Sequence, residues 1–292
     1  MSNINQLRKL AVGLVPPLFY PAILSVVNSR GLNLFLRKTG NSLYHPTWNT
    51  VPSGKLKGLK LFIDSSSGEW EQTMALGTYD LHFTRYLQKM NLNGKVFFDI
   101  GAHIGYSSLI FETLSKGRGK VVAFEPNEFN RERFEMHRNM NQKMGEKISI
   151  YPYAVSNENG KQEFVFTNNV DGWTSSGSFL AGAHTRLNGG VYEAELGFKR
   201  AKVRTVKLDS FVTRQKIHPD IIKIDVEGAE FLVIAGGMKT LQKDKPILLI
   251  ELHSIFATVR TLEMLSSVGY VTQILDEDKD GRVYIAATSN KK

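Results

Sequence analysis

The stretch Val96-Phe97-Phe98-Asp99-Ile100-Gly101-Ala102-His103-Ile104-Gly105 decides the fold of this chain. Its apolar residues predict a buried parallel strand, and the glycines follow where a helix should begin. A strand that ends in a glycine turn and leads into a helix is the usual place where an α/β sheet holds a nucleotide-like ligand. The stretch therefore predicts both an α/β sheet and a ligand site at its carboxyl edge.

An acid follows the next apolar run along the chain. The run Val121-Val122-Ala123-Phe124 ends in Glu125, twenty residues beyond Gly105. An acid at the tip of the second strand suits the two hydroxyls of a ribose. The two stretches together favour a ligand that contains a nucleoside.

The spacing of the glycines distinguishes between two cofactors. A dinucleotide-binding turn has the pattern G-x-G-x-x-G, which lets the backbone approach a pyrophosphate. Here His103 stands at the place of the middle glycine, and Asp99 precedes the turn. A carboxylate repels a diphosphate but attracts an amino group or a sulfonium. The pattern predicts S-adenosylmethionine (SAM), with Asp99 near its amino-acid end and Glu125 on its ribose; a turn that only packs a helix is the alternative.

The composition is that of a globular protein with a basic charge balance. Of the 292 residues, 42% are hydrophobic, and the formal net charge is +9. The charge favours nucleic acid, an anionic membrane face or acidic glycans as partners, with a solvated basic surface as the alternative. The chain contains no cysteine. Disulfides, zinc–thiolate sites and a cysteine nucleophile are therefore excluded.

The amino-terminal part is predicted to be an extension. The segment from Leu10 to Val27 almost lacks charge, but three prolines interrupt it, at positions 16, 17 and 21. Because proline breaks a continuous helix, we expect two short helical pieces that pack on the body or lie on a membrane surface. No small-residue cleavage site follows, so we expect no secretory signal. We expect a cytoplasmic protein, with peripheral membrane contact through this segment as an option.

The rest of the chain predicts an α/β core. Residues 1–75 would form the extension, and residues 76–292 the main domain with an insertion around residues 160–205. Helical spacing predicts helices at residues 81–90, 106–116, 128–141 and 256–268. Apolar runs and alternation predict strands at residues 96–100, 120–124, 148–151, 162–166, 202–208, 221–224, 246–250, 270–274 and 282–286.

A second group of polar residues lies in the stretch Ile221-Ile222-Lys223-Ile224-Asp225-Val226-Glu227-Gly228-Ala229-Glu230. An apolar strand here delivers Lys223, Asp225 and Glu227 to the carboxyl edge of the sheet, where ligands bind. Two acids at this place can orient a hydroxyl, accept a proton or bind a divalent cation. The alternative is helix capping by Asp225. Capping leaves unexplained why a lysine stands between two apolar residues of a buried strand.

A histidine is expected at the same edge of the sheet. The strand predicted at residues 246–250 leads into Glu251-Leu252-His253, and alternation puts Glu251 and His253 on one side. A carboxylate beside a histidine raises its basicity, and histidine titrates near neutrality. We therefore weigh His253 as a general base against a purely structural histidine.

Several of these stretches resemble the FkbM family of SAM-dependent methyltransferases, which are class I Rossmann-like enzymes. The matching stretches are Phe98–Tyr106, Ala123–Pro126, Ala154–Ser156, Ile222–Glu230 and Glu251–His253. Two positions depart from the family's pattern. Gly77-Thr78-Tyr79-Asp80 is similar to a G-x-Y-E motif but carries the shorter Asp80, and His103 stands where asparagine is common.

The resemblance implies a mostly parallel seven-stranded sheet with helices on both faces, and SAM as the cofactor. It further implies O-methylation of a hydroxyl on a sugar, a glycan or a natural product. The residues that it implies at the cofactor are Asp99, Gly101, Ala102, Gly105 and Glu125, with Ala154 near the adenine and Asp225 as a further contact.

For the reaction we expect His253 or Asp225 as the general base, with Glu227 and Lys223 orienting the acceptor. A divalent metal on Asp225 and Glu227 is left open, and so is the oligomeric state. A nucleic-acid substrate is not favoured, because Asp225-Val226-Glu227-Gly228 stands where base N-methylation usually shows an Asn/Asp-Pro-Pro-aromatic stretch. A SAM-binding module without catalysis, and a nicotinamide dehydrogenase, are the remaining alternatives.

Overall fold

The computed structural model describes residues 46–65, 69–141, 147–167, 178–181, 198–278 and 281–289. The chain divides into two compact units, Met1–His45 and Pro46–Lys292. The first unit, with the two helical pieces predicted between Leu10 and Val27, lies outside the described residues. None of the helices within the described ranges combines the length and the apolar character that crossing a membrane requires.

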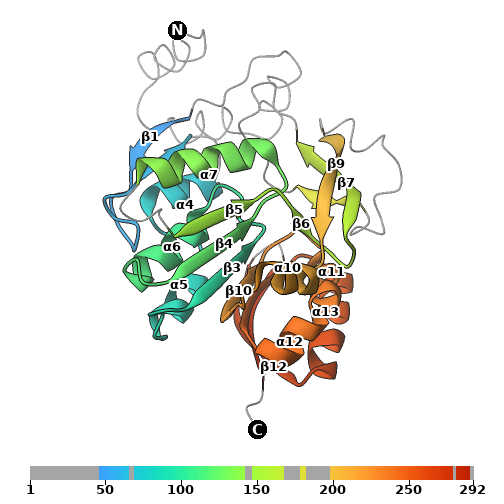
Figure 1. The fold of residues 1–292 in the computed structure, drawn as a ribbon. Coiled ribbons are helices and arrows are strands. Elements are labelled where there is room, and N and C mark those ends of the chain that lie inside the picture. Colours follow the sequence, from blue (N-terminus) through green and yellow to red (C-terminus); the bar gives the residue numbers. More distant parts are fainter. Residues whose placement is uncertain are drawn as a thin grey trace, which may run out of the picture. The chain divides into compact units, whose positions relative to one another are not determined.

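A seven-stranded sheet forms the centre of the second unit (Figure 1). Its strands lie in the order β12-β13-β11-β10-β3-β4-β5, and β13 runs antiparallel to both of its neighbours. The predicted mostly parallel seven-stranded sheet is therefore confirmed. The strands are β3 (Val96–Ile100), β4 (Lys120–Phe124), β5 (Ile148–Tyr151), β10 (Ile221–Ile224), β11 (Ile247–Leu252), β12 (Tyr270–Glu277) and β13 (Val283–Ser289).

Helices cover both faces of the sheet. Successive side chains of a strand point to opposite sides, so apolar strands give the sheet two apolar faces, and each forms its own core with the helices. Phe97 packs in one core and Phe98 in the other. The first core takes residues from α5 (Leu81–Gln88), α6 (Tyr106–Ser115) and α7 (Glu128–Met140). The second takes residues from α10 (Leu208–Gln215), α11 (Glu230–Gly236), α12 (Met238–Asp244) and α13 (Ile255–Ser267).

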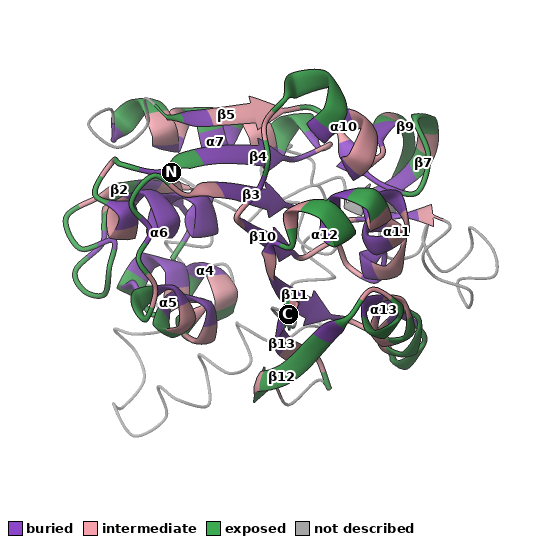
Figure 2. Ribbon diagram, turned by 60° about the horizontal axis from the view of Figure 1, so that its bottom comes forward, coloured by how far each residue is buried: buried purple, intermediate pink, exposed green. Residues whose placement is uncertain are grey.

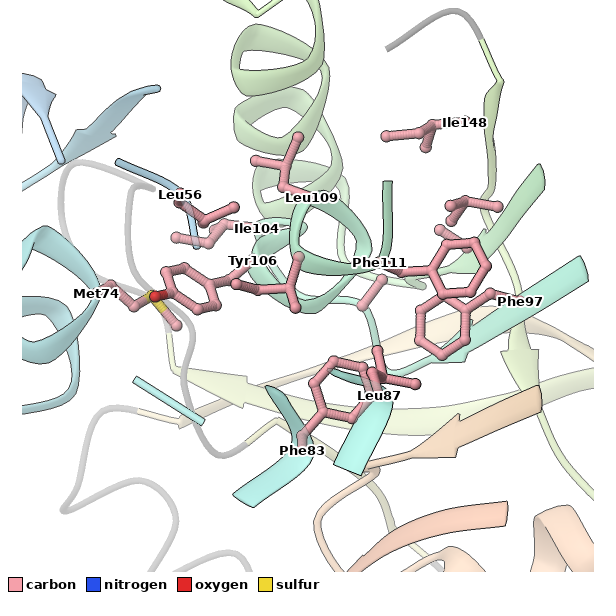
Figure 3. Close-up of a cluster of buried hydrophobic side chains, with 14 of the residues drawn as sticks. Leu56, Met74, Phe83, Leu87, Phe97, Ile104, Tyr106, Leu109, Phe111 and Ile148 are labelled. Atoms are coloured by element: carbon pink, nitrogen blue, oxygen red, sulfur yellow. The ribbon is translucent and has the colours of Figure 1, made fainter. Parts of the chain in front are cut away.

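The first core is built around stacked aromatic rings (Figure 3). The rings of Phe97 and Phe111 stack with their centroids 4.8 Å apart. The central strands are almost entirely buried, whereas β12 and the outer side of α13 are exposed (Figure 2). The apolar runs identified in the sequence are thus the strands that both helix layers cover.

The described residues before residue 76 pack against this first core. They form β1 (Thr47–Thr50), β2 (Lys60–Ile63) and α4 (Glu69–Leu76), with Leu61 and Met74 buried in the core. A buried ion pair joins α4 to α7, since Arg133 Nη1 lies 3.1 Å from Glu71 Oε1. Truncating one partner of such a pair leaves a buried charge uncompensated, at a cost of about 3–5 kcal/mol. The pair therefore holds α4 firmly beside the sheet.

A second sheet of four strands follows β5 along the chain. Its order is β6-β9-β7-β8, with β6 (Ala154–Val155), β7 (Gly160–Thr167), β8 (Phe179–Leu180) and β9 (Phe198–Val206). The long strands β7 and β9 pair antiparallel. Strand alternation predicted both of them within the expected insertion. Phe164 and Leu180 of this sheet pack with Ala154 and Ala229 in a small third core.

The structure corrects several predicted boundaries, and one strand of the second sheet shows a physical reason. The strand expected at residues 202–208 runs from Phe198 to Val206, and residue 208 already belongs to α10. Lys207 is extended at the helix start, and its N–H donates to Asn159 Oδ1 over 2.9 Å. That bond satisfies a helix-terminal donor which would otherwise stay unpaired. The helices α10 and α12 were not predicted at all.

Candidate active site

A cavity of about 540 Å³ opens at the carboxyl edge of the central sheet. Its walls come from the ends of β3, β4 and β10, from α4 and α6, from the second sheet and from β13. Parallel strands that start in register end together, so their terminal residues gather at this edge. The residues predicted there that line the cavity are Gly101, Ala102, His103, Glu125, Ala154, Lys223, Asp225 and Glu227.

The glycine turn needs its glycines for two separate reasons. Gly101 and Gly105 both have positive φ, +83° and +87°, which side chains rarely adopt. A Cβ on Gly101 would lie 1.8 Å from the carbonyl oxygen of Asp225, and one on Gly105 would lie 2.1 Å from the ring of Phe134. The turn is therefore pressed against the end of β10 on one side and against α7 on the other.

His103 occupies a position that demands an unusual backbone. Its φ is 50°, in the left-handed region, where asparagine and histidine are among the better tolerated residues. This explains how histidine can replace the asparagine common in the family. Burial lowers the pKa of His103 to about 4, so its ring is neutral near neutral pH. The backbone N–H of His103 donates to Glu125 Oε2 over 2.8 Å.

Glu125 is held at the cavity wall by backbone donors. Its Oε1 also accepts from the N–H of Asn127, over 2.9 Å. Burial nevertheless raises the pKa of Glu125 to about 7, against these hydrogen bonds. Each carboxylate oxygen has a second lone pair, so the group can still accept from a ligand hydroxyl. Ala154, Phe164 and Leu180 add an apolar wall to the same cavity.

Asp99 lies beneath the cavity and is not among the described residues that line it. Its Oδ2 accepts from Ser108 Oγ over 2.6 Å, whereas Oδ1 has no hydrogen-bond partner among the described residues. Burial raises the pKa of Asp99, and the neighbouring Lys223 opposes that rise. A buried acceptor without a donor is costly, so this oxygen is suited to a donor that the protein itself does not provide.

The other half of the site is a dense cluster of charges. Lys223 Nζ lies 2.8 Å from Asp225 Oδ2. Burial alone would lower the pKa of Lys223, but Asp225 and Asp99 raise it well above its usual value. Burial would raise the pKa of Asp225, but Lys223 and His253 lower it below its usual value. Lysine and aspartate are therefore both charged at neutral pH.

His253 lies behind this pair, with 7% of its side chain exposed. Its Nδ1 is 2.8 Å from Glu230 Oε1, and its Nε2 points toward Asp225, Glu227 and Glu251. Burial would lower the pKa of His253, but the surrounding carboxylates raise it well above the usual value. His253 is not among the described residues that line the cavity.

Glu227 stands between His253 and the cavity. It has a left-handed φ of 54° and an exposed fraction of 36% for its side chain. Burial raises the pKa of Glu227 to about 7, although His253 opposes the rise. Glu227 lines the cavity, and a left-handed φ at a residue other than glycine is a backbone strain typical of functional sites.

A comparison with known protein families identifies the family of this chain. The family model described as "Methyltransferase FkbM domain" matches residues 99–272, which is more than half of the chain. The chain belongs to the FkbM methyltransferase family. It is accordingly a SAM-dependent methyltransferase. The predicted family, fold class, enzyme class and cofactor are confirmed.

Solved structures similar to this FkbM methyltransferase include an FkbM methyltransferase from Methylobacillus flagellatus, with 16% identity and a TM-score of 0.46 over 66% of this chain. The chain spans 43% of the length of that protein. A SAM-dependent O-methyltransferase from Thermotoga maritima is 10% identical, with a TM-score of 0.43 and coverage of 73% and 66% of the two chains. An O-methyltransferase from Bacillus cereus, in complex with SAH, is 14% identical, with a TM-score of 0.43 and coverage of 71% and 80%. No curated protein matches the sequence.

The cavity of this FkbM methyltransferase suits SAM. Gly101 and Ala102 of the glycine turn line the cavity, Glu125 offers acceptors for hydroxyls, and Asp99 Oδ1 lacks a donor among the described residues. The apolar wall around Ala154 suits a purine ring. Backbone, acid and apolar wall thus provide the separate surroundings that the amino-acid, ribose and adenine parts of SAM require.

Sequence reasoning missed several residues that line the methyltransferase's cavity, and three of them are aromatic or charged. Trp70 of α4, Tyr284 of β13 and Arg282, just before that strand, line the cavity. Arg282 Nη1 and the Tyr284 hydroxyl both donate to Glu251 Oε1, over 3.2 Å each. No local signal marks them, because β13 reaches the site only by pairing with β11, which sets Tyr284 opposite Glu251.

The segment Gly77–Asp80, which is similar to the family's G-x-Y-E motif, also reaches the cavity, because Tyr79 lines it. Asp80, which replaces its glutamate, accepts from Ser107 Oγ over 3.0 Å and lies 2.9 Å from His82 Nε2. The ring of His82 packs on Tyr284, with the centroids 3.7 Å apart. The shorter acid therefore connects the start of α6 to the residues that surround Glu251.

Proposed function

We propose that this methyltransferase transfers its methyl group to a hydroxyl of a sugar, a glycan or a natural product. One observation carries the proposal: Asp225, ionised and bonded to Lys223, lines the same cavity as Gly101, Ala102 and Glu125. A hydroxyl bound beside Asp225 would therefore lie in the cavity that holds the cofactor. A hydroxyl is a weak acid and benefits from a positioned acceptor for its proton.

The cofactor residues follow from the same geometry. We assign Gly101, Ala102 and Glu125 to direct contact with SAM, and Gly105 to holding the turn against α7. Asp99 would act from below the turn, and Ala154 would lie at the adenine. Asp225, at the border of the two halves, can contact the cofactor as well as the acceptor.

Of the two bases that the sequence indicates, the geometry favours Asp225, because it lines the cavity and His253 lies behind it. Lys223 keeps Asp225 ionised and fixes Oδ2, which leaves Oδ1 to meet the acceptor. Glu227 would orient the acceptor from the other side. His253 is then a positioning residue, with Nε2 3.7 Å from Asp225 Oδ1 and 3.5 Å from Glu227 Oε2.

SAM, when bound, supplies a methyl group on a positively charged sulfur. The protein's part is to hold the acceptor oxygen at near-attack distance, about 3–3.5 Å from the methyl carbon, and in line with the bond that breaks. The oxygen–methyl bond forms as the sulfur–methyl bond breaks. The hydroxyl proton passes to Asp225 and from there to solvent.

The test is a transfer assay with methyl-labelled SAM. Panels of sugars, glycans and natural-product alcohols serve as acceptors, with RNA and DNA as controls. We expect label in an ether that survives mild alkali, which separates O-methylation of a hydroxyl from a carboxyl methyl ester. Label confined to nucleic acid, or in an alkali-labile ester, would overturn the proposal.

A further inference from the structure

The surroundings of His253 differ from those of an ordinary buried histidine. Its Nε2 is buried and has no hydrogen-bond partner among the described residues. Three carboxylate oxygens nevertheless converge on it: Glu251 Oε1 at 3.4 Å, Glu227 Oε2 at 3.5 Å and Asp225 Oδ1 at 3.7 Å. A buried ring nitrogen that faces several carboxylates but has no hydrogen bond to any of them needs an explanation. A group bound between these atoms would provide one.

The other ring nitrogen is arranged as in a metal-binding histidine. Nδ1 lies 2.8 Å from Glu230 Oε1, and Glu230 is itself fully buried. The Gly228 N–H donates to the same oxygen over 2.9 Å, which fixes the carboxylate. A carboxylate on Nδ1 holds the proton there and leaves the Nε2 lone pair free, which is the usual outer contact of a histidine ligand.

The separations between the donor atoms match those around one metal ion. At metal–ligand distances of about 2.0–2.2 Å, neighbouring ligands lie roughly 3.0–3.6 Å apart. The Nε2-to-oxygen distances of 3.4–3.7 Å fall near this range. The donor atoms of Asp225, Glu251 and His253 all lie within 4.8 Å of one another. A single cation can therefore reach all three without a large movement of the backbone.

We propose that Asp225, Glu251 and His253 bind one divalent metal ion, with Glu227 as a fourth ligand on the side of the cavity. One imidazole with several carboxylates is a donor set for Mn²⁺ or a similar divalent ion. Lys223 holds Asp225 Oδ2, the oxygen on the carboxylate that does not face His253. Arg282 and Tyr284 both donate to Glu251 Oε1, the oxygen that faces His253 Nε2, and so fix the orientation of this carboxylate.

The metal would have a defined task, which rests on the function proposed above. Asp225 and Glu227 line the cavity, so an open position on the metal would face the acceptor. A hydroxyl on a divalent cation loses its proton more easily than a free one, and that proton would pass to solvent through the open cavity. Asp225 would then act as a metal ligand, and not as a free base. Without metal, the cluster holds an imidazolium among carboxylates and Asp225 keeps the role of base.

The experiment measures metal binding without turnover. The full-length protein is stripped with a chelator and titrated with Mn²⁺, with free Mn²⁺ followed by electron paramagnetic resonance and with Mg²⁺ and Zn²⁺ run in parallel. We expect one Mn²⁺ per chain. His253→Ala and the nearly isosteric Glu251→Gln should weaken binding at least tenfold, and Glu230→Gln about tenfold through loss of the outer contact.

The control is His218→Ala, which removes another histidine near a carboxylate, since His218 Nδ1 lies 2.8 Å from Asp244 Oδ2. Its metal affinity should stay within twofold of the wild type. Thermal melting shows whether each variant is folded. Absence of binding by all three ions to the folded wild type, or binding that the ligand variants leave unchanged, would overturn the proposal.

Two further measurements separate this proposal from the function. The stripped protein should still bind SAM, because Gly101 and Glu125 take no part in the metal cluster. If the stripped protein methylates a hydroxyl at the full rate, the function stands and the metal's catalytic role is overturned. If Mn²⁺ binds as expected but no hydroxyl is methylated, the metal site stands and the proposed function fails.

Discussion

The two halves of this cavity are built in different ways. The half assigned to SAM is made mainly of backbone and of residues close together in the sequence, from Gly101 to Glu125, with an apolar wall around Ala154 added by the second sheet. Its histidine is neutral. The half assigned to the acceptor gathers charged and polar side chains from α11 and from the ends of β10, β11 and β13 or the residues next to them. The comparison indicates that the residues assigned to the cofactor belong mainly to a local sequence motif. The residues assigned to the chemistry are brought together by long-range packing.

The largest expected effect tests whether the charged half performs the chemistry. Asp225→Asn removes the proton acceptor or metal ligand, so we expect kcat to fall about 10²–10⁴-fold. SAM affinity should change by less than about threefold, because one hydrogen bond is worth about 1 kcal/mol or less there. Single-turnover kinetics and calorimetric titration measure the two effects.

The matched control is Asp244→Asn, which removes a carboxylate that pairs with His218 outside the cavity. It should leave kcat within about twofold. Equal losses of SAM affinity and kcat in Asp225→Asn would show that cofactor binding and catalysis are not divided between the two halves of the cavity.

A stability measurement tests the backbone character of the cofactor half. Gly101→Ala combines a positive φ with a clash against the Asp225 carbonyl oxygen, so the free energy of unfolding should fall by about 2–4 kcal/mol. Gly58→Ala has a similar φ of +87° but nothing within 4 Å of the added Cβ. It should cost only about 1 kcal/mol. Urea unfolding gives both values, and equal losses would show that the close approach to β10 is unimportant.

The pH dependence of cofactor binding sharpens the role of Glu125. Its pKa is raised to about 7, and ribose hydroxyls donate to the ionised form. SAM affinity should therefore rise up to about tenfold between pH 6 and pH 8, with proton release on binding below pH 7. Glu125→Gln should make the profile flat. A wild-type profile that is already flat would exclude Glu125 from the ribose.

The stability of the free protein should show the opposite sign. An acid whose folded pKa lies above its unfolded value binds more protons when folded. The contribution of Glu125 is therefore most favourable below the unfolded pKa of 4.5, and is lost as the pH rises to about 7. Chemical unfolding of wild type and Glu125→Gln across this window measures the difference.

The smallest expected effect concerns an outer residue of the charged half. Tyr284→Phe removes one donor to Glu251 and leaves Arg282 Nη1 in place. We expect a loss of kcat of roughly twofold to fivefold, corresponding to about 1 kcal/mol or less for one hydrogen bond. Phe62→Leu, in β2 and away from the cavity, is the control. A loss as large as that of Asp225→Asn would make Tyr284 a catalytic residue.

Much of the fold could be predicted because its signals are local. The apolar strands and the glycine turn could be identified in the sequence because a buried parallel strand must be apolar and a tight turn must admit positive φ. Glu125 could be identified because it directly follows one of these strands. The predicted strand at residues 120–124 and the helix starts at residues 106 and 128 coincide with β4, α6 and α7. The stretch from Lys223 to Glu230 likewise indicated one end of the charged cluster through its unusual run of charged residues alone.

Tertiary structure alone decided how these parts meet. Strand order sets Tyr284 beside Glu251, and packing of α4 brings Trp70 to the cavity, although neither residue lies in a motif. His253 was predicted at the right edge, but only the tertiary structure shows that Glu230 of α11 holds its Nδ1 and that Nε2 faces three acids. Local sequence specifies strands and turns because their backbone demands are local. The environment of a charge depends on every element packed around it.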